Sequence, residues 1–485
     1  MLYIIGNTME ETMKKRGGFV VGSPVMGSSI EGPKKQKGII EAITSFAERY
    51  VPDSYVILLL LSFITFGLAL AFTPSSPYKV VQSWGTGFWI LLEFSMQMAL
   101  IIVTGFALAT TPFCNKMLVA LARMPRTSTQ VYVWGILISA VSYYLNWGFG
   151  LIFAALFTLE LARQAELRDI RVHYKLLVAA TYSTFMIWHV GLSGSVPLLV
   201  ATPTHFMVKE MGVIPVGQTL FTSYTLWILL LVMITAIVLF WKVFPPSEES
   251  KIQTMRELRP DLLEKSLVVE SEKVEITTPS ERLTYTPILS YIIGVMFIVY
   301  LYYHFVEAQK SLDLNMVNMV FLMLIIFLHK TPANLMKAVK AATPAAWGVL
   351  LQFPFYAGIF GMMKFTGLVE VFAGWIISLT TPETFPAFVA VLSNIIGYFI
   401  PSGGGKWAVE APYIIQAGAA LGVPHAKTVI AYSFGNDWVN LIQPFWALPF
   451  MTVVGLEFRD FVGYTFISWL VVGAVMLLGL TFIPF

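Results

Sequence analysis

Long apolar runs recur along this chain and constrain its fold more than any other feature. The first, residues 54–72, holds nineteen residues without a charge. A helix of that length reaches about 28 Å, enough to cross the hydrocarbon core of a bilayer. Comparable runs occupy residues 88–111, 176–200, 223–241, 285–303 and 463–483. Because 57% of the residues are apolar and only 12% are charged, we predict an all-α polytopic membrane protein.

Charge and cysteine content exclude several classes of function. The chain has 31 Lys and Arg against 28 Asp and Glu, a net charge of +3, which provides no basic surface for nucleic acid. Its single cysteine, Cys114, cannot form an intramolecular disulfide and matches no metal-ligand spacing, so we expect a packing residue. The first forty residues are polar and basic, without the apolar core of a signal peptide.

A charged stretch, residues 245–283, separates two apolar halves. It carries six Lys and Arg and nine Asp and Glu, which is typical of a solvated linker. Lys and Arg also gather in the N-terminal segment and in two short loops of the first half, so we expect these regions on the cytoplasmic side. The predicted parts are a cytoplasmic N-terminal segment (1–50), a first transmembrane repeat (51–244), a charged cytoplasmic linker (245–283), an extra transmembrane helix (284–311) and a second transmembrane repeat (312–485).

The two halves share landmarks in the same order. A Thr-Pro pair at residue 73 is followed by a phenylalanine 21 residues later, and a Thr-Pro pair at residue 331 by one 22 residues later. Glycine-rich turns and Tyr-Ser pairs then follow at similar spacings. The extra helix between the halves turns the second copy over, which predicts two inverted-topology repeats, the architecture of secondary transporters. The C-terminus is therefore expected on the extracytoplasmic side.

Each half contains two apolar segments that are too short to span alone, and we predict that each pair forms a re-entrant helical hairpin. Residues 131–145 and 151–162 flank the turn 146–150, and the turn 401–405 separates residues 385–399 from a return arm, 407–420. Backbone at membrane depth must be buried by protein or line a polar cavity, so we expect the two tips to enclose a site. Three glycines in the second turn open a helix, and their N–H groups suit a carboxylate.

Each half also contains an interrupted transmembrane helix, with breaks predicted at residues 188–197 and 435–444. Carbonyl, amide and carboxylate oxygens at such breaks suit Na⁺. Asp437 lies in an apolar run, where an unpaired charge costs about 3 kcal/mol, so we expect it to bind a cation, carry a proton or pair with Lys406. Lys406 and Glu410 form either a local ion pair or part of the substrate site. His189 is expected to be a hydrogen-bonded interior residue.

Several motifs of the chain are typical of one family. They begin at Trp84 (Trp-Gly-Thr-Gly-Phe-Trp), Asn146 (Asn-Trp-Gly-Phe-Gly), Leu192 (Leu-Ser-Gly-Ser), Pro401 (Pro-Ser-Gly-Gly-Gly-Lys-Trp) and Gln443 (Gln-Pro-Phe-Trp-Ala-Leu-Pro). Through them the chain resembles the bacterial short-chain fatty acid transporter family, associated with acetoacetate and butyrate uptake. The resemblance implies symport of small monocarboxylates with a cation, a mobile transport domain and a scaffold that forms a homodimer in the lipid bilayer.

We therefore predict a secondary active transporter of the inner membrane that carries butyrate, acetoacetate or a similar acid with Na⁺ or H⁺. No catalytic residue and no cofactor other than a coupling Na⁺ is expected. The residues predicted to bind substrate are Gly148, Phe149, Gly150, Ser193, Ser195, Ser402, Gly403, Gly404, Gly405, Lys406 and Gln443. Those predicted to bind the coupling ion are Asn146, Asn436, Asp437 and Asn440.

Three alternatives stay open at this point. Asp437 could exchange cations for protons in an antiporter that binds no organic substrate. The chain could instead carry another small organic anion. A remote alternative is an intramembrane hydrolase with Ser402 as nucleophile and Lys406 as base, although the sequence contains no Gly-x-Ser-x-Gly motif.

Overall fold

The computed structural model describes residues 52–263 and 276–485, so the predicted N-terminal segment (1–50) lies outside the described residues. Within those two ranges the chain is helical and forms no strand. Eight helices in the same ranges are long and apolar enough to cross a membrane. The predicted all-α polytopic fold is confirmed.

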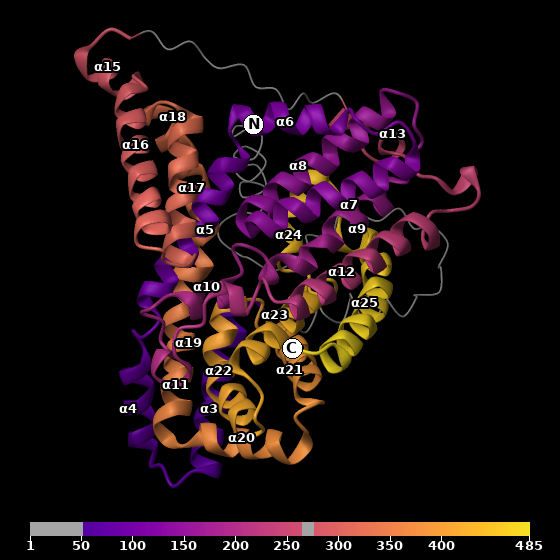
Figure 1. Cartoon of the computed structure of the whole chain (residues 1–485). Coiled ribbons are helices and arrows are strands. Elements are labelled where there is room, and N and C mark those ends of the chain that lie inside the picture. The colour runs from indigo at the N-terminus through magenta and orange to yellow at the C-terminus, as the bar shows by residue number, and fades with distance from the viewer. Residues whose placement is uncertain (1–51, 264–275) are drawn as a thin grey trace.

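Corresponding helices build the two repeats (Figure 1). The first repeat contains α3 (Ser54–Phe72), α4 (Pro77–Gly87), α5 (Leu92–Ala109), α6 (Pro112–Ala122), α7 (Ser128–Leu145), α8 (Trp147–Glu166), α9 (Tyr174–Ser183) with the 3₁₀ segment η1 (Thr184–Val190), α10 (Ser195–Ala201) and α12 (Ser223–Val238). The second contains α17 (Leu314–His329), α18 (Pro332–Ala342), α19 (Trp347–Thr366), α20 (Leu368–Leu379), α21 (Phe385–Phe399), α22 (Gly403–Ala420), α23 (His425–Val439), α24 (Ala447–Val454) and α25 (Val462–Phe482). In this order α3 corresponds to α17 and α12 to α25, and α16 (Ile288–Tyr302) lies between the repeats.

The same capping chemistry begins the second helix of each repeat. Ser76 Oγ accepts a hydrogen bond from the Lys79 N–H at the start of α4, and Thr331 caps α18 in the same way. A proline follows each cap, at a helical position whose N–H needs no partner. The counterpart of Thr331 is therefore Ser76, three residues beyond the Thr-Pro pair that served as the landmark in the sequence.

Both hairpin turns are shorter than predicted. The Asn146 side chain accepts the Phe149 N–H at 2.9 Å, so α8 begins at Trp147 and the predicted turn residues are already helical. Ser402 Oγ accepts the Gly405 N–H at 3.1 Å, so the three glycines form the first turn of α22. Side-chain caps of this kind start a helix as soon as the chain reverses.

The interrupted helices are present in both repeats, with one break displaced. In the first repeat η1 ends at Val190 and α10 begins at Ser195, inside the predicted break. In the second, α23 continues to Val439, so the predicted break at 435–444 starts five residues too early. Gly435 lies within α23, and a Cβ there would lie 2.3 Å from the Ala390 carbonyl oxygen. This glycine lets α23 and α21 pack closely.

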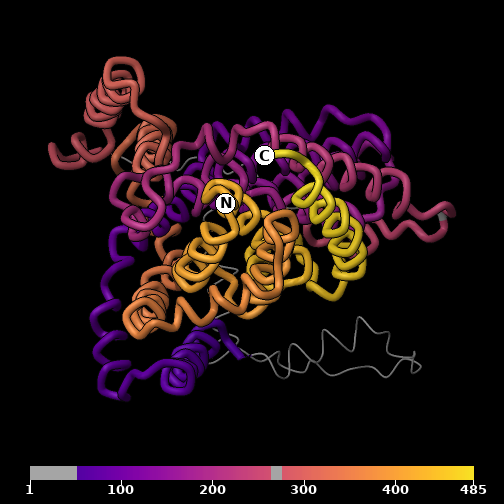
Figure 2. The backbone as a smooth tube through the Cα atoms, turned by 60° about the horizontal axis from the view of Figure 1, so that its bottom comes forward, coloured from indigo at the N-terminus to yellow at the C-terminus, as the bar shows by residue number. Residues whose placement is uncertain are grey.

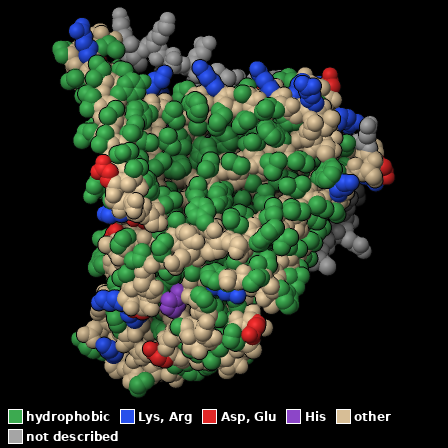
Figure 3. Space-filling view, in the orientation of Figure 1, with side chains coloured by type: hydrophobic (Ala, Val, Ile, Leu, Met, Phe, Trp, Pro, Cys, Tyr) green, Lys and Arg blue, Asp and Glu red, His purple; other side chains and the backbone are tan. Residues whose placement is uncertain are grey.

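The surface of the molecule fits a bilayer. Figure 3 shows a hydrophobic band between two rims where most of the visible charged side chains gather. Figure 2 shows the second repeat, orange to yellow, packed alongside the first, indigo to magenta. α16 and α17 pack together at one edge (Figure 1), and α16 exposes apolar side chains such as Ile292, Met296 and Val299. These side chains face the lipid in a membrane.

Part of the predicted linker packs on the helical body. α13 (Met255–Leu258) buries Met255, and the Gln253 carbonyl accepts the Tyr174 N–H at 2.9 Å. The Arg259 guanidinium donates to the Gly455 carbonyl. Residues 253–263 therefore connect the start of α9 to the end of α24, although their composition is typical of a solvated linker.

Candidate functional site

The second hairpin tip, at the start of α22, lies against the interrupted helix of the first repeat. A Cβ atom at Gly403 would lie 2.9 Å from Trp188 Cη2 and 3.0 Å from both His189 Cε1 and Asn436 Nδ2. Only glycine leaves enough room for this contact, so the tip, η1 and α23 meet here. The Tyr432 hydroxyl donates to the Gly403 carbonyl at 2.6 Å and ties the tip to α23.

Two landmark phenylalanines, one from each repeat, meet beside the same tip. Phe94 on α5 and Phe353 on α19 have ring centroids 5.5 Å apart. A Cβ atom at Gly404 would lie 2.5 Å from Phe94 Cζ and 3.5 Å from Phe353 Cζ. Each repeat therefore contributes an aromatic ring next to the polar backbone of the tip.

The first turn of α22 leaves two backbone donors free. The Ser402 N–H donates to the Ile400 carbonyl, the Gly405 N–H to Ser402 Oγ and the Lys406 N–H to the Ser402 carbonyl. The N–H groups of Gly403 and Gly404 have no acceptor within the described ranges. They lie at the positive end of the helix dipole in the protein interior, where an anion would satisfy them.

The first tip satisfies most of its backbone donors. Ser193 Oγ accepts one backbone N–H at 2.9 Å, Asn146 Oδ1 accepts the Phe149 N–H, and the Asn146 carbonyl accepts the Gly150 N–H at 2.7 Å. Of the three amides predicted to bind substrate here, Gly148 alone has no acceptor in the part of the chain that the structure describes. The two tips therefore differ in their free backbone donors, of which the first offers one and the second offers two.

His189 places a further donor next to Gly403. Its Nε2 accepts the Val196 N–H at 3.2 Å and lies 2.6 Å from Ser195 Oγ. A ring nitrogen that accepts an N–H carries no proton, so the ring is neutral and holds its proton on Nδ1. That Nδ1 is buried and has no hydrogen-bond partner among the described residues. His189 is thus an interior residue, as expected, with one donor unused.

Three acidic or basic side chains of α22 and α23 are fully buried: Lys406, Glu410 and Asp437. Lys406 Nζ donates to the carbonyl and the hydroxyl of Ser393 on α21, at 2.5 and 2.7 Å, and lies 3.7 Å from Glu410 Oε1. The Asp437 carboxylate accepts the His189 N–H at 3.0 and 3.2 Å. The local ion pair is therefore between Lys406 and Glu410, and the ammonium group lies against α21.

The predicted coupling-ion residues fall into two groups. Asn436, Asp437 and Asn440 lie at the end of α23, where Asn440 Nδ2 donates to the Asn436 carbonyl at 3.3 Å. Asn146 caps α8 on the other tip. The side chain of Gln443 accepts a nearby backbone N–H at 2.9 Å within the α23–α24 connection. In the described ranges no group of three or more His, Cys, Asp or Glu is placed to hold a metal ion.

Two residues of this region escaped prediction from the sequence. Tyr432 stood out as a repeat landmark but not as a group that bonds to the tip. Ser393 carries no signal, because a serine in an apolar run is typical of close helix packing. Only the packing of α21 against α22 brings it to Lys406.

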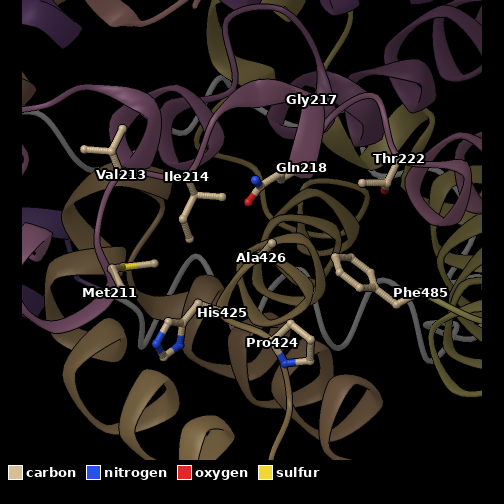
Figure 4. Close-up of a pocket in the computed structure, with 10 residues that line it drawn as sticks. All are labelled: Met211, Val213, Ile214, Gly217, Gln218, Thr222, Pro424, His425, Ala426 and Phe485. Atoms are coloured by element: carbon tan, nitrogen blue, oxygen red, sulfur yellow. The ribbon is translucent and has the colours of Figure 1, made fainter.

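A separate cavity of 490 Å³ opens at the start of α23 (Figure 4). Its lining includes Met211, Ile214 and Gln218 from the connection between α10 and α12, and His425 from α23. Asn436, beside the tip, is eleven residues beyond His425, a distance of about 16 Å along a helix. This cavity is therefore distinct from the site at the tip.

The chain is similar to known membrane transporters along almost its whole length. A family model described as "Short chain fatty acid transporter" matches residues 37–483. A "Putative short-chain fatty acid transporter" of Escherichia coli K12 is 39% identical over 440 residues, which are 90% of this chain and 98% of that relative. A Haemophilus influenzae protein of the same name is 37% identical over 448 residues, 91% of this chain and 98% of that relative. The Alcanivorax borkumensis YdaH transporter shares the fold, with a TM-score of 0.54 at 14% identity over 89% of this chain and 97% of that chain.

Proposed function

The chain belongs to the short-chain fatty acid transporter family, and we propose that it carries butyrate, acetoacetate or a similar small monocarboxylate across the membrane together with Na⁺ or H⁺. It is a multi-pass transporter and not an enzyme. The hydrolase alternative is therefore wrong. Ser402 caps α22, and the Lys406 ammonium bonds to Ser393.

The free donors at the start of α22 are the observation that carries this proposal. The N–H groups of Gly403 and Gly404 and the Nδ1–H of His189 lie together in the interior. A buried donor without an acceptor costs about 1–3 kcal/mol, so this arrangement favours a ligand that accepts several hydrogen bonds. A carboxylate accepts through two oxygens, and the rings of Phe94 and Phe353 offer apolar contact to a short alkyl chain.

The size of such a substrate sets the affinity that we expect. Butyrate has about six heavy atoms, and the best small ligands gain about 1.5 kcal/mol per heavy atom. The binding free energy would then not exceed about 9 kcal/mol in magnitude. Dissociation constants in the micromolar to millimolar range are therefore expected.

For a coupling Na⁺ we retain Asn436, Asp437 and Asn440, which lie beside the tip at the end of α23. Transporters with broken helices bind their coupling ions at such breaks. The polar side chains of Asn146 and Ser193 already bond to backbone N–H groups. We therefore assign Ser193 to holding the first tip against the interrupted helix, and Asn146 to capping α8 at that tip.

We place the transporter in the inner membrane with a cytoplasmic N-terminus and an extracytoplasmic C-terminus. The support is the gathering of Lys and Arg in the short loops of one side. The exposed apolar face of α16 is suited to lipid or to a second copy in a homodimer.

Uptake of radiolabelled butyrate into proteoliposomes tests the proposal, with a Na⁺ gradient and a pH gradient imposed separately. Protein-free liposomes must be subtracted at each pH, because butyric acid crosses bilayers unaided. Protein-dependent accumulation under either gradient would support carboxylate symport. Proton movement without any carboxylate would instead indicate a cation/proton antiporter. If other organic anions accumulate and butyrate does not, the protein is a transporter whose substrate is one of those anions.

A further inference from the structure

We infer that the Lys406 ammonium is a built-in cation that occupies a cation position between α21, α22 and α23, so that transport by this chain needs no Na⁺ and is coupled to H⁺ alone. This inference rests on the proposed function and names its coupling ion. Lys406 is fully buried and follows the tip glycines directly. Its charge is therefore part of the site whether or not substrate is bound.

The atoms around the ammonium are of the kinds that bind Na⁺. They are the carbonyl and hydroxyl oxygens of Ser393 at 2.5 and 2.7 Å and a carboxylate oxygen of Glu410 at 3.7 Å. The ring of Tyr432 lies 4.8 Å from Nζ, and an aromatic face attracts any cation. α21 also approaches closely, since a Cβ at Gly397 would lie 3.1 Å from Nζ. Hard oxygen ligands suit an alkali cation as well as an ammonium.

Lys406 is not placed to bind the substrate carboxylate. An ammonium has three hydrogens, of which two bond to Ser393, and its ion-pair partner is Glu410. The substrate donors proposed above are the backbone amides of Gly403 and Gly404. The lysine therefore balances charge behind the tip, where a free cation would otherwise bind.

Two buried carboxyl groups lie near one ammonium group, so one negative charge is left for a proton to neutralise. Glu410 and Asp437 are both fully buried, and one lysine balances one of them. Asp437 accepts the His189 N–H, whereas neither carboxylate oxygen of Glu410 accepts a hydrogen bond from any residue that the structure describes. When Glu410 takes up a proton, the ammonium charge that it had balanced is left to balance Asp437, so we assign the coupling proton to Glu410.

The other titratable groups that face this cluster do not change its charge. A tyrosine is neutral near pH 7, and His189 is held neutral because its Nε2 accepts the Val196 N–H. The remaining groups are Tyr356 on α19, Tyr413 on α22 and Tyr432 on α23. The charge of the cluster is then set by Lys406, Glu410 and Asp437 alone.

Thermal unfolding in detergent, without substrate, tests the built-in cation directly. Samples in NaCl and in choline chloride at equal ionic strength are compared. We expect the unchanged chain to show the same Tm in both salts. Lys406→Met empties the position while keeping most of the side-chain volume, so Na⁺ should raise its Tm by about 4 °C or more. Lys427→Met is the matched control, because Lys427 also lies over a tyrosine ring but far from the tip along α23, and it should not respond to Na⁺.

Two results of the unfolding experiment would overturn the inference. One is a Na⁺-dependent Tm in the unchanged chain, and the other is a folded Lys406→Met variant that does not respond to Na⁺. Because no substrate is present, failure of butyrate transport would leave these results interpretable.

Glu410→Gln provides a second test that does not require Lys406→Met to fold. Gln cannot carry the coupling proton, so accumulation driven by a pH gradient should be lost. Exchange of internal for external butyrate, which needs no net proton movement, should persist. Full accumulation by Glu410→Gln under a pH gradient, or accumulation by the unchanged chain that requires Na⁺, would refute the coupling.

Discussion

The hydrogen bond between Tyr432 and the tip provides the most specific test of the site. Tyr432→Phe removes the hydroxyl that donates to the Gly403 carbonyl at 2.6 Å and leaves the ring beside Lys406. A buried neutral hydrogen bond contributes about 1 kcal/mol to stability. If this bond holds the tip in its binding position, its loss should raise KM for butyrate about fivefold, since a tenfold change corresponds to about 1.4 kcal/mol.

Tyr224→Phe is the matched control for this prediction. The Tyr224 hydroxyl is also buried and donates to a backbone carbonyl, that of Leu480, at 2.9 Å. Both variants should lose similar stability in thermal unfolding, because each loses one bond of the same kind. Initial rates of butyrate uptake into proteoliposomes, corrected for protein-free liposomes, should show a raised KM for Tyr432→Phe alone. An unchanged KM in Tyr432→Phe, or an equal rise in both variants, would refute the assigned role of the tip.

Two further substitutions test the donors at the tip. Gly403→Ala would place a Cβ 2.9 Å from the Trp188 ring and should abolish uptake, whereas Gly67→Ala, with nothing within 4 Å, should leave uptake unchanged. His189→Gln keeps an acceptor for the Val196 N–H and removes the Nδ1 donor, so KM should rise about tenfold at unchanged Tm. His189→Asn keeps a donor and leaves the Val196 N–H unpaired, so unfolding measurements should show a loss of about 1–3 kcal/mol. Equal uptake by both glycine variants, or an unchanged KM in His189→Gln, would contradict these roles.

The fold could be predicted from the sequence because few backbone structures satisfy all their hydrogen bonds in lipid. Uncharged runs such as residues 54–72 must become helices in a bilayer, since their backbone groups have no other partners. Landmarks at matching spacing in the two halves indicated a duplication, and Phe94 and Phe353 indeed meet in space. The lengths and the order of the transmembrane helices depend on local composition, which the sequence provides without knowledge of tertiary contacts.

The details of the site depended on contacts that spacing cannot reveal. Gly435 was expected to interrupt a helix, yet it lies within α23, where the nearby Ala390 backbone leaves no room for a Cβ. Ser193 was predicted to bind substrate, and its hydroxyl accepts a backbone N–H of the first tip, 46 residues earlier in the chain, which spacing alone does not reveal. Ser393 was not predicted at all, since its role arises only where α21 meets Lys406. In each case the role of the residue depends on a contact with a residue far away in the sequence, and composition does not reveal such a contact.

The buried charges also suggest why a carboxylate would not move alone. With Lys406 positive and both Glu410 and Asp437 ionised, the interior carries one net negative charge before substrate binds. A bound carboxylate would make it two. At an effective dielectric constant of 20, two like charges repel by about 4 kcal/mol at about 4 Å, and by half of that at twice the distance. A proton on Glu410 removes that repulsion and restores the charge of the empty site. Substrate and proton should therefore bind cooperatively, and a neutral amide of the same size should bind without favouring protonation.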